Sequence, residues 1–436
     1  MSKRPSGKKT RSASAPSAAA TTRPEFHWTA PARWSWLLGL GVLLAVALFL
    51  RWHFFDFPLE RDESAYAYLG KRVLDGQVPY RDMYEMKPPL LFYSYAALVA
   101  VFGYSAGGIH LAAFVLTLWN AIWLMAVGAR LFGLFYGFVA GLCWVLLTAN
   151  PAANAILLES ELLIMAWVLP GLYCLLRWDA APGAGAGKWW LLASGFLLAC
   201  GILVKQSALF FLGAPAMLLL WRYWTERPRQ LAGLVRNAGW FAAGVLGPVV
   251  FFGLLLWSQG AWSDFWFWNV QYLSVYSSGL KKDLWLQAFT FNFDLLTRGF
   301  GLYWLLGLVG LFTLLRPGLP GRHRALLFGL LLFAAAAVVP GWRFYAHYWL
   351  QLLPVLALLI ALQFYQIERG AARVFTQRHP RLLVAGLAVI LLVTPVLQNG
   401  VLLFKSDHDR TIRSLFPGNP YAEDKTLAGL IGSKIR

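Results

Sequence analysis

Acidic and basic residues gather in one stretch of this sequence, Asp56 to Tyr95, which lies between two apolar runs. It holds seven acids and five bases in forty residues, although only 13% of the whole chain is charged. Charged groups beside a bilayer are costly unless they reach water, so paired acids and bases here indicate a functional site. We interpret the stretch as the active-site loop of a membrane enzyme.

Asp62 and Glu63 are the first candidates for catalysis within this loop. They open a segment, Glu63 to Leu74, whose apolar residues, Tyr66 among them, share one face of a helix. Paired acids can supply a general base for an incoming hydroxyl or amine. They can equally cap the N-terminus of a helix, and spacing alone does not separate the two roles.

Two lysines could face an anion. Lys87 follows Glu85 and precedes two prolines, where its ammonium would either meet a phosphate as a point charge or extend to lipid headgroups. Lys205 falls between two apolar runs without a neighbouring charge, while Glu159 and Glu161 open another apolar run. We predict that Lys205 and both acids lie on the same side of the membrane as the charged loop.

A short turn, Gly341 to Tyr348 (GWRFYAHY), combines one arginine and one histidine with four aromatic residues. It is explained either as an aromatic belt at the membrane interface or as a phosphate contact made by Arg343 and His347, with Tyr345 beside them. The long segment Ser258 to Arg298 is rich in tryptophan and could shape an acceptor cleft, although an interfacial helix would have the same composition.

The composition is that of a membrane protein. Apolar residues make up 59% of the chain, and 22 Trp and 17 Tyr suit a protein whose amphipathic rings collect at both interfaces. The net charge of +18 is dispersed between apolar runs and forms no basic face, which argues against nucleic acid as a partner. The three cysteines all fall in apolar runs, without the spacing of a disulfide framework or metal site.

The alternation of charge predicts the topology. Residues 1–33 form a disordered basic tail with seven Lys/Arg, which places it on the cytoplasmic side and the loop 53–106 on the outer side. Pro88 to Phe102 is only fifteen residues long, whereas a crossing needs about twenty, so we expect it to lie along the interface. Residues 405–436 form a short outer tail. We expect an all-α polytopic membrane protein, with a transmembrane domain over 34–404 and eleven spans: 34–50, 107–127, 134–149, 157–176, 189–204, 208–221, 237–257, 300–315, 325–339, 347–365 and 382–404.

These residues occur in an order that resembles a known family. The Asp62–Glu63 pair, the tyrosine-rich helix after it and the KPPL run at Lys87 are similar to GT-C type membrane glycosyltransferases, in the branch of protein O-mannosyltransferases and lipid A aminoarabinose transferases (family 39). The resemblance covers roughly Arg61 to Pro354 and includes the later motifs ESELLIM, LVKQSAL and RFYAHYWLQLLP.

The resemblance implies an enzyme that moves a sugar from a polyprenyl-phosphate carrier to a glycan, lipid or protein acceptor. It implies a bacterial inner-membrane protein with a periplasmic active site, whose partners are the lipid-linked sugar donor and the surrounding membrane lipids. A divalent metal is possible. A flippase or transporter of lipid-linked sugars, which forms no bond, is the alternative. The roles implied are a general base or acceptor-orienting acid at Asp62 supported by Glu63, phosphate contacts at Lys87, Lys205, Arg343 and His347, and acceptor or supporting contacts at Tyr66, Glu85, Glu161 and Tyr345.

Overall fold

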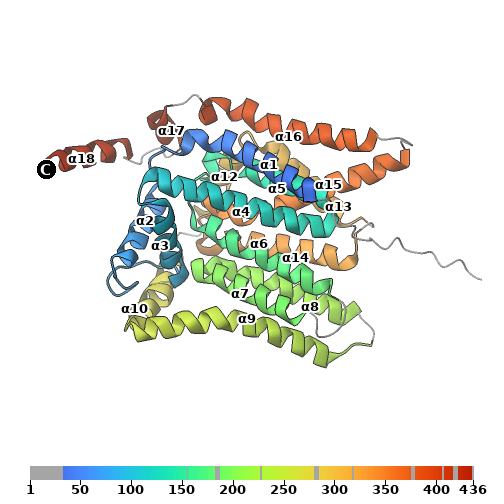
Figure 1. The fold of residues 1–436 in the computed structure, drawn as a ribbon, viewed down its shortest axis with the longest axis horizontal. Helices are drawn as coiled ribbons and strands as arrows, with labels where there is room; N and C mark the ends of the chain where they lie inside the picture. The colour runs from blue at the N-terminus through green and yellow to red at the C-terminus, as the bar shows by residue number, and fades with distance from the viewer. Residues whose placement is uncertain are drawn as a thin grey trace, which may run out of the picture.

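The computed structural model describes residues 33–154, 156–181, 187–225, 228–278, 284–316, 319–374, 379–404, 407–415 and 421–434. The basic tail before Arg33 lies outside these ranges. The described chain is helical, as expected (Figure 1). Its long or apolar helices are α1 (Arg33–Arg51), α4 (Ala106–Phe132), α5 (Leu134–Leu147), α6 (Ser160–Asp179), α7 (Lys188–Val204), α8 (Gly213–Thr225), α9 (Leu231–Ser258), α13 (Gly301–Leu314), α14 (Gly321–Val338), α15 (Leu353–Val374) and α16 (His379–Phe404).

Shorter elements join these helices. They are α2 (Arg61–Leu74), α3 (Pro89–Phe102), α10 (Trp262–Trp266), a π-helical turn (Phe267–Tyr272), α11 (Leu273–Ser278), α12 (Trp285–Thr297), α17 (His408–Leu415), α18 (Tyr421–Lys434) and the 3₁₀ turns η1 (Trp52–Phe54), η2 (Pro151–Ala153), η3 (Gln206–Leu212), η6 (Pro340–Trp342) and η7 (Ala346–Gln351).

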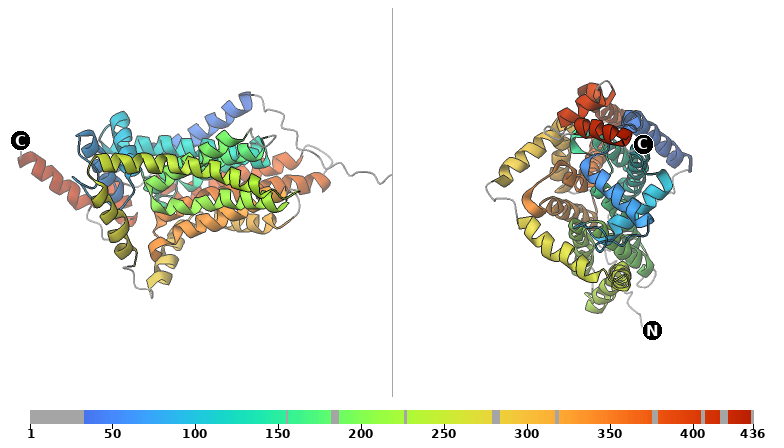
Figure 2. Two further views of the ribbon diagram at one scale, coloured as in Figure 1. Left: turned by 90° about the horizontal axis from the view of Figure 1, so that it is seen from below. Right: turned by 90° about the vertical axis from the view of Figure 1, so that its left-hand side faces the viewer.

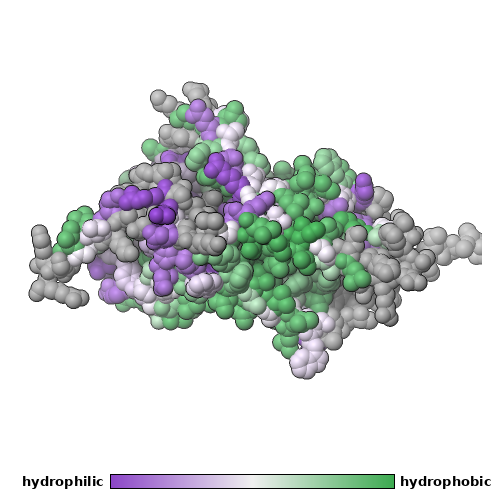
Figure 3. Space-filling model, turned by 90° about the horizontal axis from the view of Figure 1, so that it is seen from above, coloured by the Kyte–Doolittle hydropathy of each residue, from purple (hydrophilic) through white to green (hydrophobic). Residues whose placement is uncertain are grey.

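The chain is a multi-pass membrane protein. Among the described residues, six helices are long and apolar enough to cross a membrane, and the pair α12 and α13, bent by 105°, would make a seventh. The eleven predicted spans are not confirmed by this measure, because α5, α7 and the apolar part of α16 are shorter than a full crossing. Figure 3 shows an apolar band between more polar ends of the molecule. Exposed leucines and valines of α1 and α16 are the kind of residue that such a band presents to lipid.

Glycines allow the helices of the bundle to approach one another closely. A Cβ built on Gly137 of α5 would lie 2.3 Å from the carbonyl oxygen of Met125 in α4. A Cβ on Gly195 of α7 would lie 2.2 Å from the carbonyl oxygen of Phe241 in α9. Small residues are typical of helix contacts in membranes, because backbone packing replaces the hydrophobic effect there.

Helices α2 and α3 lie across one end of the bundle, at a steep angle to α4 and α9 (Figures 1 and 2). This arrangement agrees with the expectation that Pro88 to Phe102 does not cross the membrane. The two helices pack tightly, since a Cβ on Gly70 would lie 2.6 Å from the backbone of Tyr95. Helix α2 starts at Arg61 rather than at Glu63, two residues earlier than predicted.

Three predicted spans start later than expected, all near this end. The span predicted from Leu157 becomes helical only at Ser160. The span predicted from Ala208 begins as the 3₁₀ turn η3, and the one predicted from His347 begins as η7. Irregular backbone at membrane depth is tolerated where it lines a cavity, because its polar groups then find partners other than lipid.

Candidate active site

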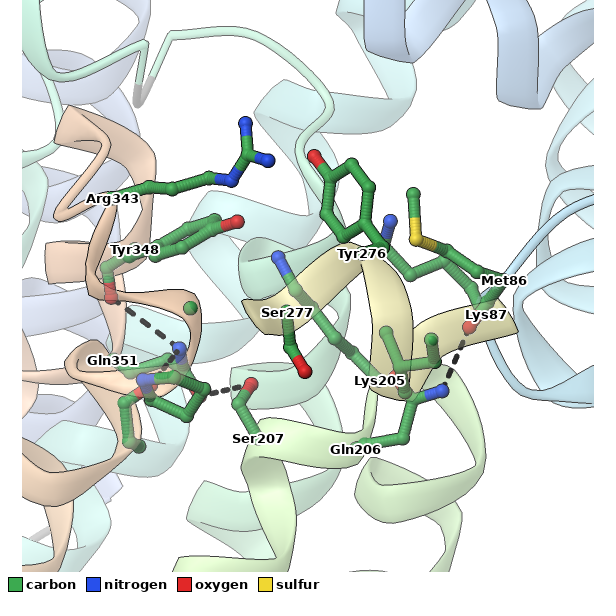
Figure 4. Close-up of a pocket in the computed structure, with 14 residues that line it drawn as sticks. Met86, Lys87, Lys205, Gln206, Ser207, Tyr276, Ser277, Arg343, Tyr348 and Gln351 are labelled. Atoms are coloured by element: carbon green, nitrogen blue, oxygen red, sulfur yellow. Dashed lines mark hydrogen bonds between the residues drawn. The ribbon is translucent and has the colours of Figure 1, made fainter. Parts of the chain in front are cut away.

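A cavity of about 260 Å³ opens near the segments whose α-helices start later than predicted (Figure 4). Its walls come from the loop before α3, from η3, from α11 and from the turn between α14 and α15. Three cationic side chains, those of Lys87, Lys205 and Arg343, line it and extend into the same space. Such a set of cations attracts an anion of the size of a phosphate.

The turn that carries Arg343 has an unusual backbone. Gly341, Trp342 and Phe344 have φ values of 76°, 56° and 49°. Residues other than glycine rarely adopt this left-handed region. Such backbone persists where the surroundings over-determine it, which is common at functional sites. The turn presents a guanidinium that donates to the Tyr345 hydroxyl over 3.1 Å.

Arg343 has aromatic rather than acidic neighbours. Its guanidinium carbon lies 4.3 Å from the centre of the Tyr276 ring. Its Nε is buried and has no hydrogen-bond partner among the described residues. No carboxylate pairs with Arg343 within the described part of the chain. Its charge therefore remains available to an anion in the cavity.

The two lysines of the cavity are each paired with an acid. The ammonium of Lys205 forms a salt bridge with Glu161, whose side chain is fully buried, and lies 4.3 Å from the centre of the Tyr348 ring. The ammonium of Lys87 lies 3.5 Å from Glu85 and 5.8 Å from the centre of the buried Tyr66 ring. The acids hold the lysines in place but also neutralise part of their charge.

Beside this cavity, Asp62 meets Glu159 and His347. One ligand atom from each of the three residues lies within 4.8 Å of the other two. Asp62 does not cap helix α2, because that role belongs to Glu60, whose side chain accepts from the Asp62 N–H over 2.6 Å. The alternative role of helix cap is thereby excluded for Asp62, whereas Glu63 completes the capping box of α2. The Asp62 carboxylate faces the cluster and also pairs with Arg61, whose Nε lies 3.1 Å away.

The environment shifts the pKa values of these three residues in different directions. Burial disfavours the charge of Asp62, but the basic groups around it, His347, Lys87 and Arg61, hold its pKa below the ordinary value. Burial lowers the pKa of His347 to about 4, so its ring is neutral at pH 7. Burial, and next the charge of Asp62, raises the pKa of Glu159 well above its usual range. An ionised and a protonated carboxyl side by side is a common arrangement of acid–base sites.

The same three residues fit a divalent cation. A neutral imidazole and two carboxylates are ligands that zinc and manganese accept. The Oε2 atom of Glu159 is buried without a hydrogen-bond partner among the described residues, and its Oε1 lies 3.8 Å from Nδ1 of His347. The cluster is therefore a candidate metal site as well as an acid–base pair.

The structure separates the predicted residues into groups. Lys87, Lys205 and Arg343 line the cavity together, Tyr345 contacts Arg343, and Tyr66 and Glu85 contact or pair with Lys87. His347 lies with the acids rather than among the residues that line the cavity. Glu161 holds Lys205, and Glu63 is buried against His110 on the other side of α2.

Sequence reasoning did not include Glu159 among the site residues. It chose Glu161, which begins an apolar run, but the structure places Glu159 beside Asp62. Both acids belong to the same motif, and only the backbone conformation before α6 distinguishes them.

Residues 60–297, more than half of the chain, match the family model described as dolichyl-phosphate-mannose-protein mannosyltransferase. The match includes α2, the loop before α3, Glu159 and Lys205. No curated protein sequence matches the chain.

Two solved structures are similar in fold. One is ArnT from Cupriavidus metallidurans bound to undecaprenyl phosphate, with a TM-score of 0.53 and 19% identity over 86% of this chain and 73% of that one. The other is the oligosaccharyltransferase AglB from Archaeoglobus fulgidus in complex with an inhibitory peptide and a dolichol-phosphate, with a TM-score of 0.57 and 13% identity over 87% of this chain and 56% of that one. The chain thus spans just over half the length of AglB.

These similarities establish a GT-C-like helical fold. The match to the family model covers the acid pair and the lysines of the site. The chain therefore belongs to the dolichyl-phosphate-mannose-protein mannosyltransferase family, and it is a membrane glycosyltransferase that uses a polyprenyl-phosphate-linked sugar.

Proposed function

We propose that this enzyme transfers the sugar to a hydroxyl or amine of a glycan, lipid or protein acceptor at the outer face of a bacterial inner membrane. The observation that carries the proposal is the juxtaposition of the acid cluster at Asp62 with the cationic cavity at Lys87. Lys87 lies close enough to lower the pKa of Asp62 and also lines the cavity. A base and a phosphate site that adjoin each other are what a transfer from a sugar phosphate requires.

In the proposed reaction the acceptor oxygen or nitrogen attacks the anomeric carbon, and the bond from that carbon to the phosphate oxygen breaks. The proton of the acceptor passes to the Asp62 carboxylate. The bonding electrons leave with the polyprenyl phosphate, which gains one negative charge as it changes from a diester to a monoester. Attack from the face opposite the phosphate inverts the anomeric configuration.

The cations stabilise the leaving group in this scheme. Arg343, Lys205 and Lys87 face a phosphate whose negative charge grows along the reaction, so their attraction is stronger in the transition state than in the bound substrate. Tyr345 orients Arg343 through its hydroxyl. The neutral carboxyl of Glu159 can donate a hydrogen bond to the acceptor, and a divalent cation held by Asp62, Glu159 and His347 would instead polarise a bound oxygen as a Lewis acid.

The proposed orientation has the N-terminus in the cytoplasm and the site on the outer side. Helix α1 starts at the end of the bundle opposite α2 and α3, and the basic tail precedes it (Figure 1). The eleven-span arrangement remains part of this proposal. The short apolar helices α5 and α7 pack along α4 and α9 and run in the direction of the crossing helices.

The replacement Asp62→Asn tests the proposed function. It keeps the shape of the side chain but removes the base, so transfer should fall by about 10²–10⁴-fold. The assay follows release of undecaprenyl phosphate from undecaprenyl-phosphate sugars by purified protein in the presence of cell-envelope extract. Mass spectrometry of lipids and surface glycans, with and without the protein, identifies the acceptor.

Asp75→Asn is the matched control for this experiment. Asp75 caps the opposite end of the same helix and pairs with Lys71 at the surface. This variant should transfer sugar at the normal rate. Near-normal transfer by Asp62→Asn in folded protein would remove Asp62 from the mechanism.

A further inference from the structure

Glu63 is a buried carboxylate that the proposed reaction does not use. Its side chain is fully buried, and it makes three hydrogen bonds or ionic contacts with groups from three parts of the chain. Oε1 accepts from the Glu60 N–H over 2.9 Å and lies 3.0 Å from Nε2 of His110. Oε2 accepts from the Leu158 N–H over 2.9 Å. A buried carboxylate is tolerated only when it is satisfied in this way.

The contact with Leu158 leads directly to the acid cluster. Leu158 precedes Glu159, and its own carbonyl oxygen accepts from the hydroxyl of the buried Tyr95. Both polar groups of Leu158 are thus held, one by α2 and one by α3. The backbone is extended at Glu159, with φ −77° and ψ 152°, because this residue caps α6: its carbonyl oxygen accepts from the Leu162 N–H over 3.0 Å, and the contacts of Leu158 fix the chain on its other side.

We propose that Glu63 is a positioning residue, which places the Glu159 carboxyl beside Asp62 by holding the Leu158 backbone. The inference rests on the proposed function, in which Asp62 and Glu159 face the acceptor. Asp62 and Glu63 are neighbours on one helix turn, so a single short segment supplies one acid to the reaction and anchors the other. The same carboxylate therefore fixes the distance between the two functional acids.

His110 holds Glu63 in this arrangement. Nδ1 of His110 lies 3.3 Å from the carbonyl oxygen of Phe55, while Nε2 faces Glu63. A ring with protons on both nitrogens makes both contacts and balances the charge of the carboxylate. His110 is the fifth residue of α4, and therefore connects the position of Glu63 to a membrane helix.

A double-mutant cycle between Glu63 and Glu159 tests the proposal. Glu63→Ala should lower kcat at least about tenfold, because Glu159 is no longer held at its place. In the Glu159→Ala background the same replacement should change kcat less than about twofold, since the group that Glu63 positions is already absent. The KM for undecaprenyl-phosphate sugar should stay unchanged in all three variants, because the cationic cavity is intact.

Several controls separate positioning from a general loss of structure. Ser105→Ala removes the side-chain cap of α4 near His110 but does not touch Glu63, so its kcat should equal that of wild type. Size-exclusion chromatography in detergent reports whether each variant is folded. If Glu63→Ala does not fold, Glu63→Gln serves in the cycle, because it keeps the volume while one of its two acceptor oxygens becomes an amide donor.

The outcomes are distinguishable. Independent, multiplicative losses of kcat in the two single variants would overturn the positioning role of Glu63, and so would a raised KM at unchanged kcat. Asp62→Asn is measured in the same assay. Normal transfer by Asp62→Asn would instead overturn the proposed function, whatever the cycle shows.

Discussion

The buried pair of Lys205 and Glu161 allows a test that separates stability from substrate binding. The side chain of Glu161 is fully buried and that of Lys205 is 11% exposed. Lys205→Met retains the length of the side chain and its contact with the Tyr348 ring. Among the described residues, it leaves the Ser160 hydroxyl, 2.9 Å away, as the one hydrogen-bond partner of the Glu161 carboxylate. The double variant Lys205→Met with Glu161→Gln also removes the negative charge of Glu161, which the single variant leaves without its lysine.

The magnitude follows from the burial of the pair. Breaking a buried ion pair by removing one partner destabilises a protein by about 3–5 kcal/mol, because the remaining charge is not compensated. Even the lower figure shifts the ratio of folded to unfolded protein by more than about a hundredfold. Replacing both partners by neutral groups is often close to neutral in free energy of unfolding. The double variant should therefore recover most of the stability that Lys205→Met loses.

Activity should behave differently from stability. The double variant still lacks one of the three cations in the cavity, so transfer should remain at least about tenfold below that of wild type. Thermal unfolding in detergent and release of undecaprenyl phosphate measure the two quantities on the same samples. Lys71→Met with Asp75→Asn, which removes an exposed pair on α2, should change neither.

Two results would refute this reasoning. Full activity of the double variant would show that Lys205 serves only to neutralise Glu161 and does not act on the donor. Wild-type stability of Lys205→Met would show that the buried Glu161 carboxylate finds another partner, so that its burial does not determine how much free energy of unfolding is lost with Lys205.

Two further predictions concern the phosphate and the base. Arg343→Gln should raise the KM for the donor about tenfold or more, and Arg343→Lys should recover only part of this loss of affinity. Arg298→Gln, which removes an exposed ion pair, should leave the KM unchanged. A KM equal to wild type in Arg343→Gln would remove Arg343 from the phosphate site. Because the pKa of Asp62 lies below its ordinary value of 3.8 and a base acts when ionised, the rate should be constant from roughly pH 5 to 8 and fall only in stronger acid. A rate that increases with pH through the neutral range would assign the base to Glu159 instead, whose pKa is raised.

The sequence was sufficient to predict the helical membrane fold, whereas the interfacial position of Pro88 to Phe102 and the side of the membrane on which the site lies remain predictions. These properties depend on local hydropathy and charge, which a single chain displays. Lys205 was singled out because an isolated lysine between apolar runs is costly without a function or a partner, and its phosphate contact stays a prediction. What spacing did not reveal was that the partner is Glu161, since the two residues are 44 positions apart.

The acids show where sequence reasoning reaches its limit. Glu159 and Glu161 are two residues apart, and a regular helix would have related their directions by its period. The chain is extended at Glu159 and helical only from Ser160, so that period does not apply. Consecutive residues of a helix point about 100° apart, which is why Asp62 faces the cluster while Glu63 is buried. The residue that receives Glu63, His110, comes from another helix.

In three apolar segments the α-helix starts later than the hydropathy predicts, and this affects how variants of the protein should be interpreted. Residues such as Leu158, Ala208 and Leu350 belong to runs that a hydropathy profile assigns to the lipid-embedded part of the chain. In the folded protein all three lie outside regular α-helix and are buried near the site. A change of side chain there would alter catalytic geometry before it altered insertion into the bilayer. Harmful substitutions at these positions should therefore yield protein that reaches the membrane in normal amount but does not transfer sugar.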